Sequence, residues 1–422
     1  MANAFNKEEK VAFEQILQGF EDALVLSKNV TIYNSDQQGM ERQNDVIWRP
    51  MPYIMQKFSG LDQTDNFKNA TQLSVPATIG FLDSVPWVMD SKELRDALQQ
   101  DRLGMGARQR LASSVNTSVL NVASNQGTLV VKSVGATINY STIAEADAIM
   151  NEQGVPMEDR YFALSTRDYN AAASDLAGRQ DLSAQKSLSA YERSYVGGVA
   201  GFQTYKMDRS NSIAAALGGG GITIDTQAAA TNYYVPQATS TAATGETSNV
   251  DNRTQNITVS TTVNVAVGDC FTISGVNSIH QIEKTTTNQL KTFRVIDVVD
   301  GTTLSISPPI VSAQGGSDAE LQYQNVDLTP AAAAAITFLN TAAAPINCFW
   351  HKDAIELLPG NLAVPSDAGA SVMRGTLENG IEVVWQKQYD IKTSQTFYRL
   401  DCLYGVVMTN REMAGILLAN QV

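Results

Sequence analysis

The sequence has few of the side chains on which most enzymes and secreted scaffolds depend. Its 422 residues include three cysteines and two histidines. Cys270, Cys348 and Cys402 are too far apart for a paired zinc or redox motif, and an odd number is untypical of a disulfide framework. No His-Glu-x-x-His, strand-linked G-x-G-x-x-G or G-x-S-x-G motif occurs, and His280 and His351 are expected to be structural. We therefore expect no catalytic centre, metal or cofactor.

Long apolar runs and an excess of positive charge are also missing. No stretch reaches the roughly 20 apolar residues that cross a bilayer, and the charged residues 7–10 interrupt any N-terminal export signal. Thirty basic residues against 43 acidic ones give a net charge of −13, which disfavours direct binding to nucleic acid. With 43% hydrophobic residues, the chain is expected to fold in a reducing cytosol and not to embed in a membrane.

The N-terminal segment is predicted to form an amphipathic helix. Its apolar residues recur mostly at steps of three and four: Val11, Phe13, Ile16, Leu17, Phe20, Leu24 and Leu26. Acidic residues, among them Glu14, Glu21 and Asp22, occupy the other face. Such a helix is either an arm that reaches outward or an element that packs on its own domain.

Residues 48–88 are punctuated by proline and glycine, with short β-like runs between them. This pattern predicts a long hairpin excursion whose polar tip spans residues 62–68. Loops of this length are usually functional or disordered.

The strongest helical signal covers residues 91–126. Asp90 is a candidate N-cap with Glu93 at the capping-box spacing, and apolar residues then recur at helical steps. An unbroken helix of this extent would be about 50 Å long. Gly104 and Gly106 fall inside it, where they could kink or break it.

The rest of the chain contains two regions that differ in composition and in predicted secondary structure. Residues 128–215 alternate β-like runs with helical ones, at 141–152 and 168–177, which is an α+β pattern. From 219 to 329 the composition shifts to Thr, Ser, Asn and Val. Short alternating runs, among them 303–307, and regular turns, among them one at Gly275, predict an inserted barrel or sandwich. A helical run is expected at 330–341, after which the α+β character resumes.

These features occur together with local matches spread over nearly the whole chain. The matches are GMERQNDVIWRP at 39–50, Leu94-Arg95-Asp96, Leu111-Ala112, Val115, Asn121-Val122-Ala123, Gly127, Tyr161-Phe162, Asp168-Tyr169, Val199-Ala200-Gly201-Phe202, Val250-Asp251-Asn252-Arg253, Val298-Val299-Asp300-Gly301-Thr302, Phe349-Trp350, Asp353-Ala354-Ile355 and Tyr404-Gly405-Val406. In this order and spacing, the chain resembles the coat (major capsid) proteins of the short-tailed Salmonella phage group and its Shigella relatives.

The resemblance implies an α+β fold of the Hong Kong type found in tailed-phage capsids, with an inserted all-β barrel. That fold has an N-terminal arm, an extended loop, a spine helix, and peripheral and axial domains. The implied boundaries are 1–47 for the arm, 48–88 for the extended loop, 89–128 for the spine helix of the peripheral domain, 129–218 for the axial and peripheral body, 219–344 for the insert and 345–422 for the return to the body.

The function that the resemblance implies is that of a bacteriophage major capsid protein, not an enzyme. Such a protein assembles through hexamers and pentamers into an icosahedral procapsid in the bacterial cytoplasm and matures into the DNA-filled head of the virion. The implied partners are further copies of the chain, a scaffolding protein and a portal protein. Packaged DNA would be enclosed without specific binding, and no membrane would be involved.

Relatives bind their scaffold through acidic residues on the coat arm. The resemblance therefore implies Glu14 as a scaffold-binding residue, with Glu21 and Asp22 as substitutes; a solvated helix face is the alternative. In relatives a loop of the insert also reaches a neighbouring subunit through charged pairs. The corresponding residues 235–249 carry only Glu246 as a charged residue, so hydrogen bonding or no contact are the alternatives there.

The tip of the long hairpin supplies further candidates for contacts between subunits, because such loops overlap adjacent subunits in the family. Asp62, Asp65 and Lys68 are the candidate ion-pair residues, and a solvated loop tip is the alternative.

Two other functions stay open on the sequence. A glycan- or receptor-binding structural module would need exposed aromatic clusters in the insert, whose aromatic candidates are Tyr233, Tyr234, Phe271, Phe293, Tyr323 and Phe338. An enzyme with an unrecognised site is the second alternative.

Overall fold

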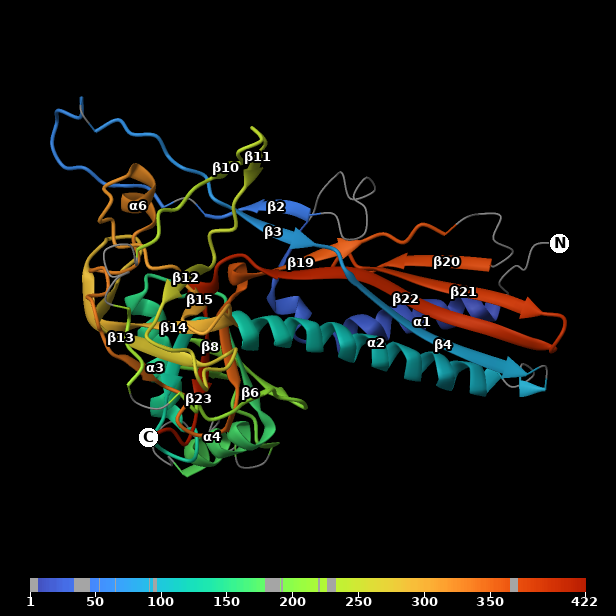
Figure 1. Cartoon of the computed structure of the whole chain (residues 1–422). Helices are drawn as coiled ribbons and strands as arrows, with labels where there is room; N and C mark the ends of the chain where they lie inside the picture. The colour runs from blue at the N-terminus through green and yellow to red at the C-terminus, as the bar shows by residue number, and fades with distance from the viewer. Residues whose placement is uncertain are drawn as a thin grey trace. The chain divides into compact units, whose positions relative to one another are not determined.

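The computed structural model describes residues 7–33, 46–52, 54–64, 66–90, 92–93, 97–178, 190, 193–218, 221–225, 233–364 and 371–422. The chain divides into two compact units. The first consists of Met1–Ile47, Ala77–Val122 and Ile355–Val407, and the second of Trp48–Pro76, Ala123–Ala354 and Met408–Val422. Each unit is thus built from segments that are distant in the sequence (Figure 1).

A six-stranded sheet forms the centre of the first unit. Its strands are β1 (Thr31–Ile32), β19 (Ile355–Gly360), β22 (Gln395–Met408), β21 (Glu382–Asp390) and β20 (Ser371–Thr376) in spatial order, with β4 (Phe81–Asp90) also paired to β22. β22 is 14 residues long and pairs antiparallel with both β4 and β21. Its backbone is therefore hydrogen-bonded on both sides along most of its length.

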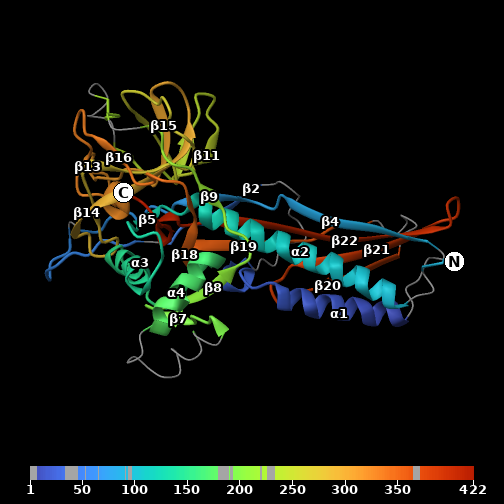
Figure 2. The same ribbon diagram turned by 90° about the horizontal axis from the view of Figure 1, so that it is seen from below.

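Two helices pack within this unit, α1 (Lys7–Ala23) and α2 (Ala97–Gln126), whose last four residues lie beyond the unit's boundary at Val122. Figure 2 shows α1 and α2 running side by side. The predicted apolar face of α1 is buried, and the ring of Phe13 lies 5.8 Å from that of Trp385 on β21. On α2, the buried side chains of Leu111, Val115 and Val119 form the stripe that the sequence predicted.

The long helix differs from its prediction in two respects. β4 continues to Asp90, and the described part of the helix begins at Ala97 rather than at residue 91. Only one half of the expected capping box forms, since the Asp90 amide donates to the Glu93 carboxylate at 3.2 Å. Gly104 does not break the helix; a Cβ there would lie 2.9 Å from Cδ1 of Ile16, so the glycine allows α1 to approach closely.

The second glycine of this helix provides a stability test. A Cβ added at Gly106 would meet no atom within 4 Å. We expect Gly106→Ala to raise the free energy of unfolding by about 0.5 to 1 kcal/mol, because alanine loses less backbone entropy in a helix. Urea denaturation of the purified subunit measures the change, with Gly104→Ala as the control that should gain nothing. A G106A protein no more stable than wild type would contradict the prediction.

The second unit contains a six-stranded sheet with helices packed on it. Its strands are, in spatial order, β5 (Leu129–Lys132), β23 (Ala414–Leu418), β18 (Asn347–His351), β6 (Arg160–Ser165), β8 (Phe202–Met207) and β7 (Gly198–Val199). The predicted helices are confirmed as α3 (Tyr140–Glu152) and α4 (Thr166–Gly178), and α3 begins with Asn139 accepting from the Thr142 amide. Phe162, Phe202 and Phe349 form the aromatic centre of the core between them.

The predicted β insert forms a barrel within the second unit. Its five-stranded sheet has the order β12 (Gln255–Thr258), β15 (Thr303–Ser307), β14 (Thr286–Val298), β13 (Cys270–Ile279) and β16 (Ile336–Phe338). Residues 222–225 lie between the two edges: Thr223 bridges to Ala335 beside β16, and Ile224 bridges to Val259 beside β12. This segment closes the sheet around a core that includes Phe271 and Phe293, both fully buried.

Two local expectations for the insert are wrong. Residues 330–341 form no helix; they contain β16, which pairs with β13. Gly275, which reads as a turn residue, lies inside β13 with φ of +79°, where the register to β14 is irregular. A glycine at a bulge accepts this backbone angle without the strain that a side chain would cause.

The remaining elements are short. They are β2 (Val46–Pro50) paired with β3 (Ser74–Thr78), β9 (Ser212–Ile213) paired with β17 (Ala344–Pro345), β10 (Thr239–Thr241) paired with β11 (Thr247–Asn249), α6 (Asp318–Tyr323), and the 3-10 turns Ser27–Asn29, Lys352–Ala354 and Arg411–Met413. Among the described residues, no helix is both long and apolar enough to cross a membrane.

Candidate functional site

The three cysteines and His351 are buried in structural roles. All three cysteines are free and buried. Burial raises the pKa of Cys270 to about 11 and that of Cys348 to about 12, so neither is a nucleophilic thiolate at neutral pH. His351 is buried on β18, its Nδ1 accepts from the Asp353 amide at 3.2 Å, and burial lowers its pKa. Within the described ranges, no three His, Cys, Asp or Glu side chains are grouped to hold a metal ion.

The acidic face of α1 is the first candidate surface. Glu14 is exposed, whereas its neighbours Phe13 and Ile16 are buried against the unit. Glu21 and Asp22 also lie on α1, but their side chains are outside the described ones. The sequence did not distinguish these acids from Glu9, which is 5% exposed.

Glu9 serves to attach α1 to the sheet of its unit. Its Oε1 lies 2.5 Å from Nζ of Lys387 and 3.5 Å from the Tyr398 hydroxyl. Burial, together with the nearby Glu9 carboxylate, raises the pKa of Tyr398. The helix is therefore held by a buried ion pair on one face and leaves Glu14 to solvent on the other.

The tip of the long loop carries the second set of candidates. The Asp62 carboxylate accepts from the hydroxyl and the amide of Thr64, at 2.6 and 3.1 Å, and these hydrogen bonds lower its pKa. Asp62 is therefore an exposed, ionised side chain that is held in a local turn. Asp65 lies outside the described residues.

Lys68 differs from the expectation, because it has a partner in its own chain. Its Nζ lies 3.1 Å from the carboxylate of Asp318, at the start of α6 in the insert. The same loop is tied to α6 at Thr71, whose amide donates to Gln322 at 2.9 Å and whose carbonyl accepts from the Tyr323 hydroxyl at 2.9 Å. The base of the extended loop is thus docked on the insert of the same subunit.

Because the loop is docked by an exposed ion pair, we expect the loss of this pair to loosen the loop without changing the stability of the whole subunit. Lys68 and Asp318 are 35% and 42% exposed, so Lys68→Glu should change the free energy of unfolding by less than about 1 kcal/mol. Repulsion from Asp318 should nevertheless open the loop more often and speed limited proteolysis between residues 54 and 70 by about two- to fivefold. Lys57→Glu, at an exposed lysine of the same loop, is the control. Equal cleavage of both variants would show that the ion pair does not hold the loop.

The hairpin of β10 and β11 is the third candidate surface. Its strands pair from Thr239↔Asn249 to Thr241↔Thr247, and every residue of both strands is exposed. Glu246 lies exposed in the turn between them. A two-stranded ribbon of this kind is at best marginally stable on its own.

A group of buried basic residues in the second unit was missed by the sequence analysis. Lys291 on β14 is 2% exposed, forms an ion pair with Glu412 and donates to Oε1 of Gln153 at 3.0 Å. Arg294, also 2% exposed, donates to the carbonyl oxygen of Ser124 and to that of Gly127. Basic side chains in a strand are normally expected to be exposed, so the sequence gives no sign that these two residues connect the insert to the body.

The sequence matches one family, described as P22 coat protein, gene protein 5, over residues 1–419. The chain belongs to the P22 coat protein family. As a P22-family coat protein it is a phage major capsid protein that forms icosahedral heads, a component of the virion and not an enzyme. The expected α+β tailed-phage capsid fold with an inserted β domain is confirmed.

Several solved structures resemble this P22-family chain. The CUS-3 coat protein I-domain is 42% identical over 28% of this chain and 95% of its own, with a TM-score of 0.21. The structure titled Mycobacterium phage Che8 is 10% identical over 93% of this chain and 90% of its own, with a TM-score of 0.42. The capsid of cyanophage P-SCSP1u is 12% identical over 93% and 86%, with a TM-score of 0.43.

A glycan- or receptor-binding module would need exposed aromatic side chains in the insert, and the described part of the insert does not show them clustered on its surface. Phe271 and Phe293 are fully buried in the barrel core, and Phe338 packs against the same core. Tyr234 and Tyr323 are half-buried and hydrogen-bond to Asn252 and to Thr71. The described part of the insert therefore presents no cluster of exposed aromatic rings.

Proposed function

We propose that this P22-family coat protein assembles through hexamers and pentamers into a procapsid, around an internal scaffolding protein and with a portal protein, and then matures around packaged DNA. A homo-oligomeric shell follows from the family. The net charge of −13 supports the proposed scaffold and the enclosed DNA, because it favours a basic scaffolding protein and disfavours direct binding of the DNA.

The scaffold contact is proposed on the acidic face of α1, at Glu14 with Glu21 and Asp22. The observation that carries this assignment is the exposure of Glu14 on a helix whose other face is fixed by Phe13, Ile16 and the Glu9–Lys387 ion pair. An anchored helix presents its charges in a defined pattern, which is what a basic partner helix requires.

Charge reversal at Glu14 tests this contact. We expect Glu14→Lys to weaken scaffold binding by about three- to tenfold and to make the residual binding less dependent on salt. Co-sedimentation of shells with purified scaffolding protein measures the binding, and Glu158→Lys, at an exposed acid of the second unit, is the control. Binding by E14K that equals that of wild type and E158K would favour the solvated helix face.

Contacts between subunits are proposed at the hairpin turn, through Glu246, and at the loop tip, through Asp62 and Asp65. Full exposure of β10 and β11 supports the first, and the ordered, ionised carboxylate of Asp62 supports the second. For Lys68 the ion pair with Asp318 supports a different role, in which the lysine sets the direction in which the loop leaves its own subunit.

The insert is proposed to be a separate folding domain with the boundaries 219–344. Its barrel is closed by residues 222–225 near one boundary, and β17 (Ala344–Pro345) marks the other. Its own aromatic and aliphatic core supports this assignment, because a closed barrel has no free edge and buries its core without the body.

A further inference from the structure

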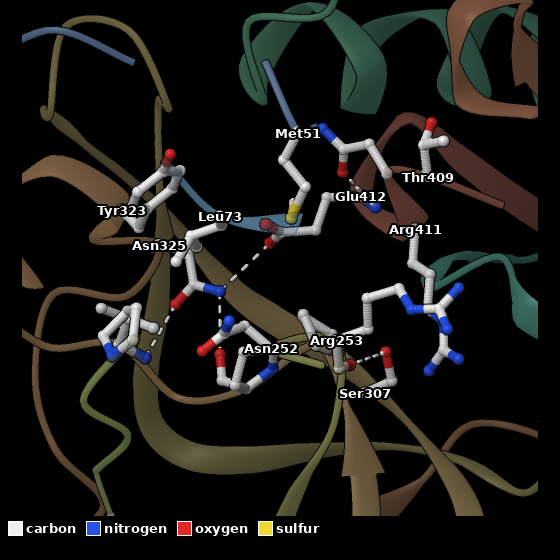
Figure 3. A pocket seen from close by; sticks show the side chains of 15 residues that line it. Met51, Leu73, Asn252, Arg253, Ser307, Tyr323, Asn325, Thr409, Arg411 and Glu412 are labelled. Carbon is white, nitrogen blue, oxygen red and sulfur yellow. Dashed lines mark hydrogen bonds between the residues drawn. The ribbon is translucent and has the colours of Figure 1, made fainter. Parts of the chain in front are cut away.

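The hairpin of β10 and β11 leaves the second unit from a root that is fixed by buried side chains. Asn252, which is 5% exposed, accepts from the Gln237 amide at 3.0 Å and donates to the carbonyl oxygens of Gln237 and Val250 at 2.8 and 3.0 Å. Figure 3 shows Asn252 beside Arg253 in the wall of a small pocket, and Arg253 donates to the Met408 carbonyl at 2.9 Å. The two ends of the hairpin are therefore tied to each other and to the rest of their unit.

The far end of the hairpin is ordered as well. The Ala242 amide donates to the Glu246 carbonyl at 2.8 Å, and the Gly245 amide donates to the Ala242 carbonyl at 2.9 Å. Gly245 has φ of +88°, the left-handed conformation that a three-residue hairpin loop requires at this place. Between root and turn, residues 239–249 are all exposed. The chain thus presents a preformed ribbon to its surroundings.

The hydrogen bonds of the ribbon show which backbone groups point outward. The Val250 amide donates to the Ala238 carbonyl at 3.3 Å, so the even-numbered residues of this strand face β11. By the register, Thr239 and Thr241 alternate with them, and their N–H and C=O groups point away from β11. The Oγ1 atoms of Thr241 and Thr247 lie 3.3 Å apart, as expected for a pair without backbone hydrogen bonds between them. β10 therefore has two donors and two acceptors on its outer edge.

The outer edge of β10 is more open than that of β11. The chain of β11 continues to Asp251, which bridges to Ser74 in β3, so a strand added to β11 would meet this bridge. Exposed edges are usually protected by proline, lysine or other charged side chains. β10 has the sequence Thr-Ser-Thr and carries none of these. Its edge is therefore suited to pairing with another strand.

We propose that β10 pairs antiparallel with β10 of a second copy of the chain, across a two-fold axis of the shell. This pairing rests on the proposed function, because it requires assembly. Thr239 of each copy exchanges both backbone hydrogen bonds with Thr241 of the other, which gives four bonds, and the two Ser240 residues lie opposite each other. An antiparallel edge matches its own donors and acceptors, as a contact between identical surfaces requires.

The distribution of charge favours a second copy as the partner. Each copy has a net charge of −13, so two copies repel less where neither carries a charged side chain. Between Asp225 and Asp251 the one charged residue is Glu246. Antiparallel pairing places the two Glu246 turns about 14 Å apart along the strands and about 14 Å apart across them. This separation exceeds the screening length of about 8 Å, so the two carboxylates do not oppose the contact.

A single cysteine on β10 tests this pairing. In the paired strands the two Ser240 Cα atoms are about 4.5 Å apart, within the range of a disulfide. Ser248 on β11 is the matched control, because its two copies would be about 14 Å apart. The three native cysteines are buried and do not compete. After mild oxidation of assembled shells, we expect Ser240→Cys to give at least about tenfold more disulfide-linked dimer than Ser248→Cys on non-reducing gels.

The outcomes separate the pairing from the assembly on which it rests. Closed shells of S240C with no more dimer than shells of S248C would overturn the pairing and leave the proposed assembly intact. Dimers in S248C shells alone would also overturn it, because they would place the contact on β11. Wild-type subunits that form no shells under any assembly condition would overturn both the pairing and the proposed function.

Discussion

Replacing Lys291 with methionine is expected to lower the free energy of unfolding by about 3 to 5 kcal/mol. The lysine is 2% exposed and forms an ion pair with Glu412, which has Asn325 as its other hydrogen-bond partner. Removing the ammonium leaves the Glu412 carboxylate in a poorly solvated site without its ion-pair partner, and although Lys284 still attracts it, the cost of that charge exceeds what the methionine regains by burial. Urea denaturation followed by circular dichroism measures the loss.

The double variant K291M/E412Q shows how much of the destabilisation comes from losing the ion pair and how much comes from leaving the Glu412 carboxylate buried without a partner. Because the second substitution removes the carboxylate, we expect it to recover at least half of the stability that K291M loses. The control is Lys132→Met, at a lysine of the same unit that is exposed. A loss below about 1 kcal/mol in K291M would show that water reaches Glu412 and that the pair is not a structural connection.

Gly405→Ala is expected to lower the free energy of unfolding by about 3 kcal/mol. A Cβ at this position in β22 would lie 2.2 Å from the carbonyl oxygen of Thr78. That atom belongs to the backbone and cannot rotate away, so the segment after β3 has to shift. Thermal unfolding and the yield of soluble subunit measure the effect.

The matched control for this substitution is Gly106→Ala in the same unit, where the added methyl group meets open space. The two variants add the same atom, so their difference reports the local packing once the gain of about 0.5 to 1 kcal/mol expected for alanine in the helix is subtracted. Similar unfolding midpoints for G405A and G106A would mean that the close approach of Thr78 to β22 is not a requirement of the fold.

The sequence predicted the elements whose burial pattern is periodic. The apolar spacing of α1, the stripe on α2 and the alternating run at 303–307 all correspond to buried faces of regular elements. These signals are local, since each depends only on which side of one helix or strand faces the core.

Residues 330–341 show where local signals mislead. Five consecutive alanines favour a helix by propensity, yet they provide no apolar stripe to hold one against the barrel. The backbone instead hydrogen-bonds to residues 222–224, more than one hundred positions earlier, and continues into β16. A contact between residues so far apart in the sequence produces no periodic pattern of apolar residues within the segment itself.

The sequence predicted the candidate surfaces only in part, because the contacts of their charged side chains also depend on distant residues. Glu9 lies four residues before Phe13, in phase with the buried side of α1, but the sequence does not show that Lys387 pairs with it there while Glu14 stays exposed. Lys68 looked like a free loop charge because Asp318 is 250 positions away. Partners of charged side chains are set by tertiary structure, which composition and spacing do not encode.

The length of β22 has a mechanical consequence for a container wall. Between Gln395 and Cys402 it is hydrogen-bonded to β21 on one side and to β4 on the other. Pulling along the strands strains all of these bonds at once, whereas pulling across them would open them one after another. Stretching along the strands therefore meets resistance from many hydrogen bonds together, so β4, β22 and β21 withstand a load along their length better than a load across it.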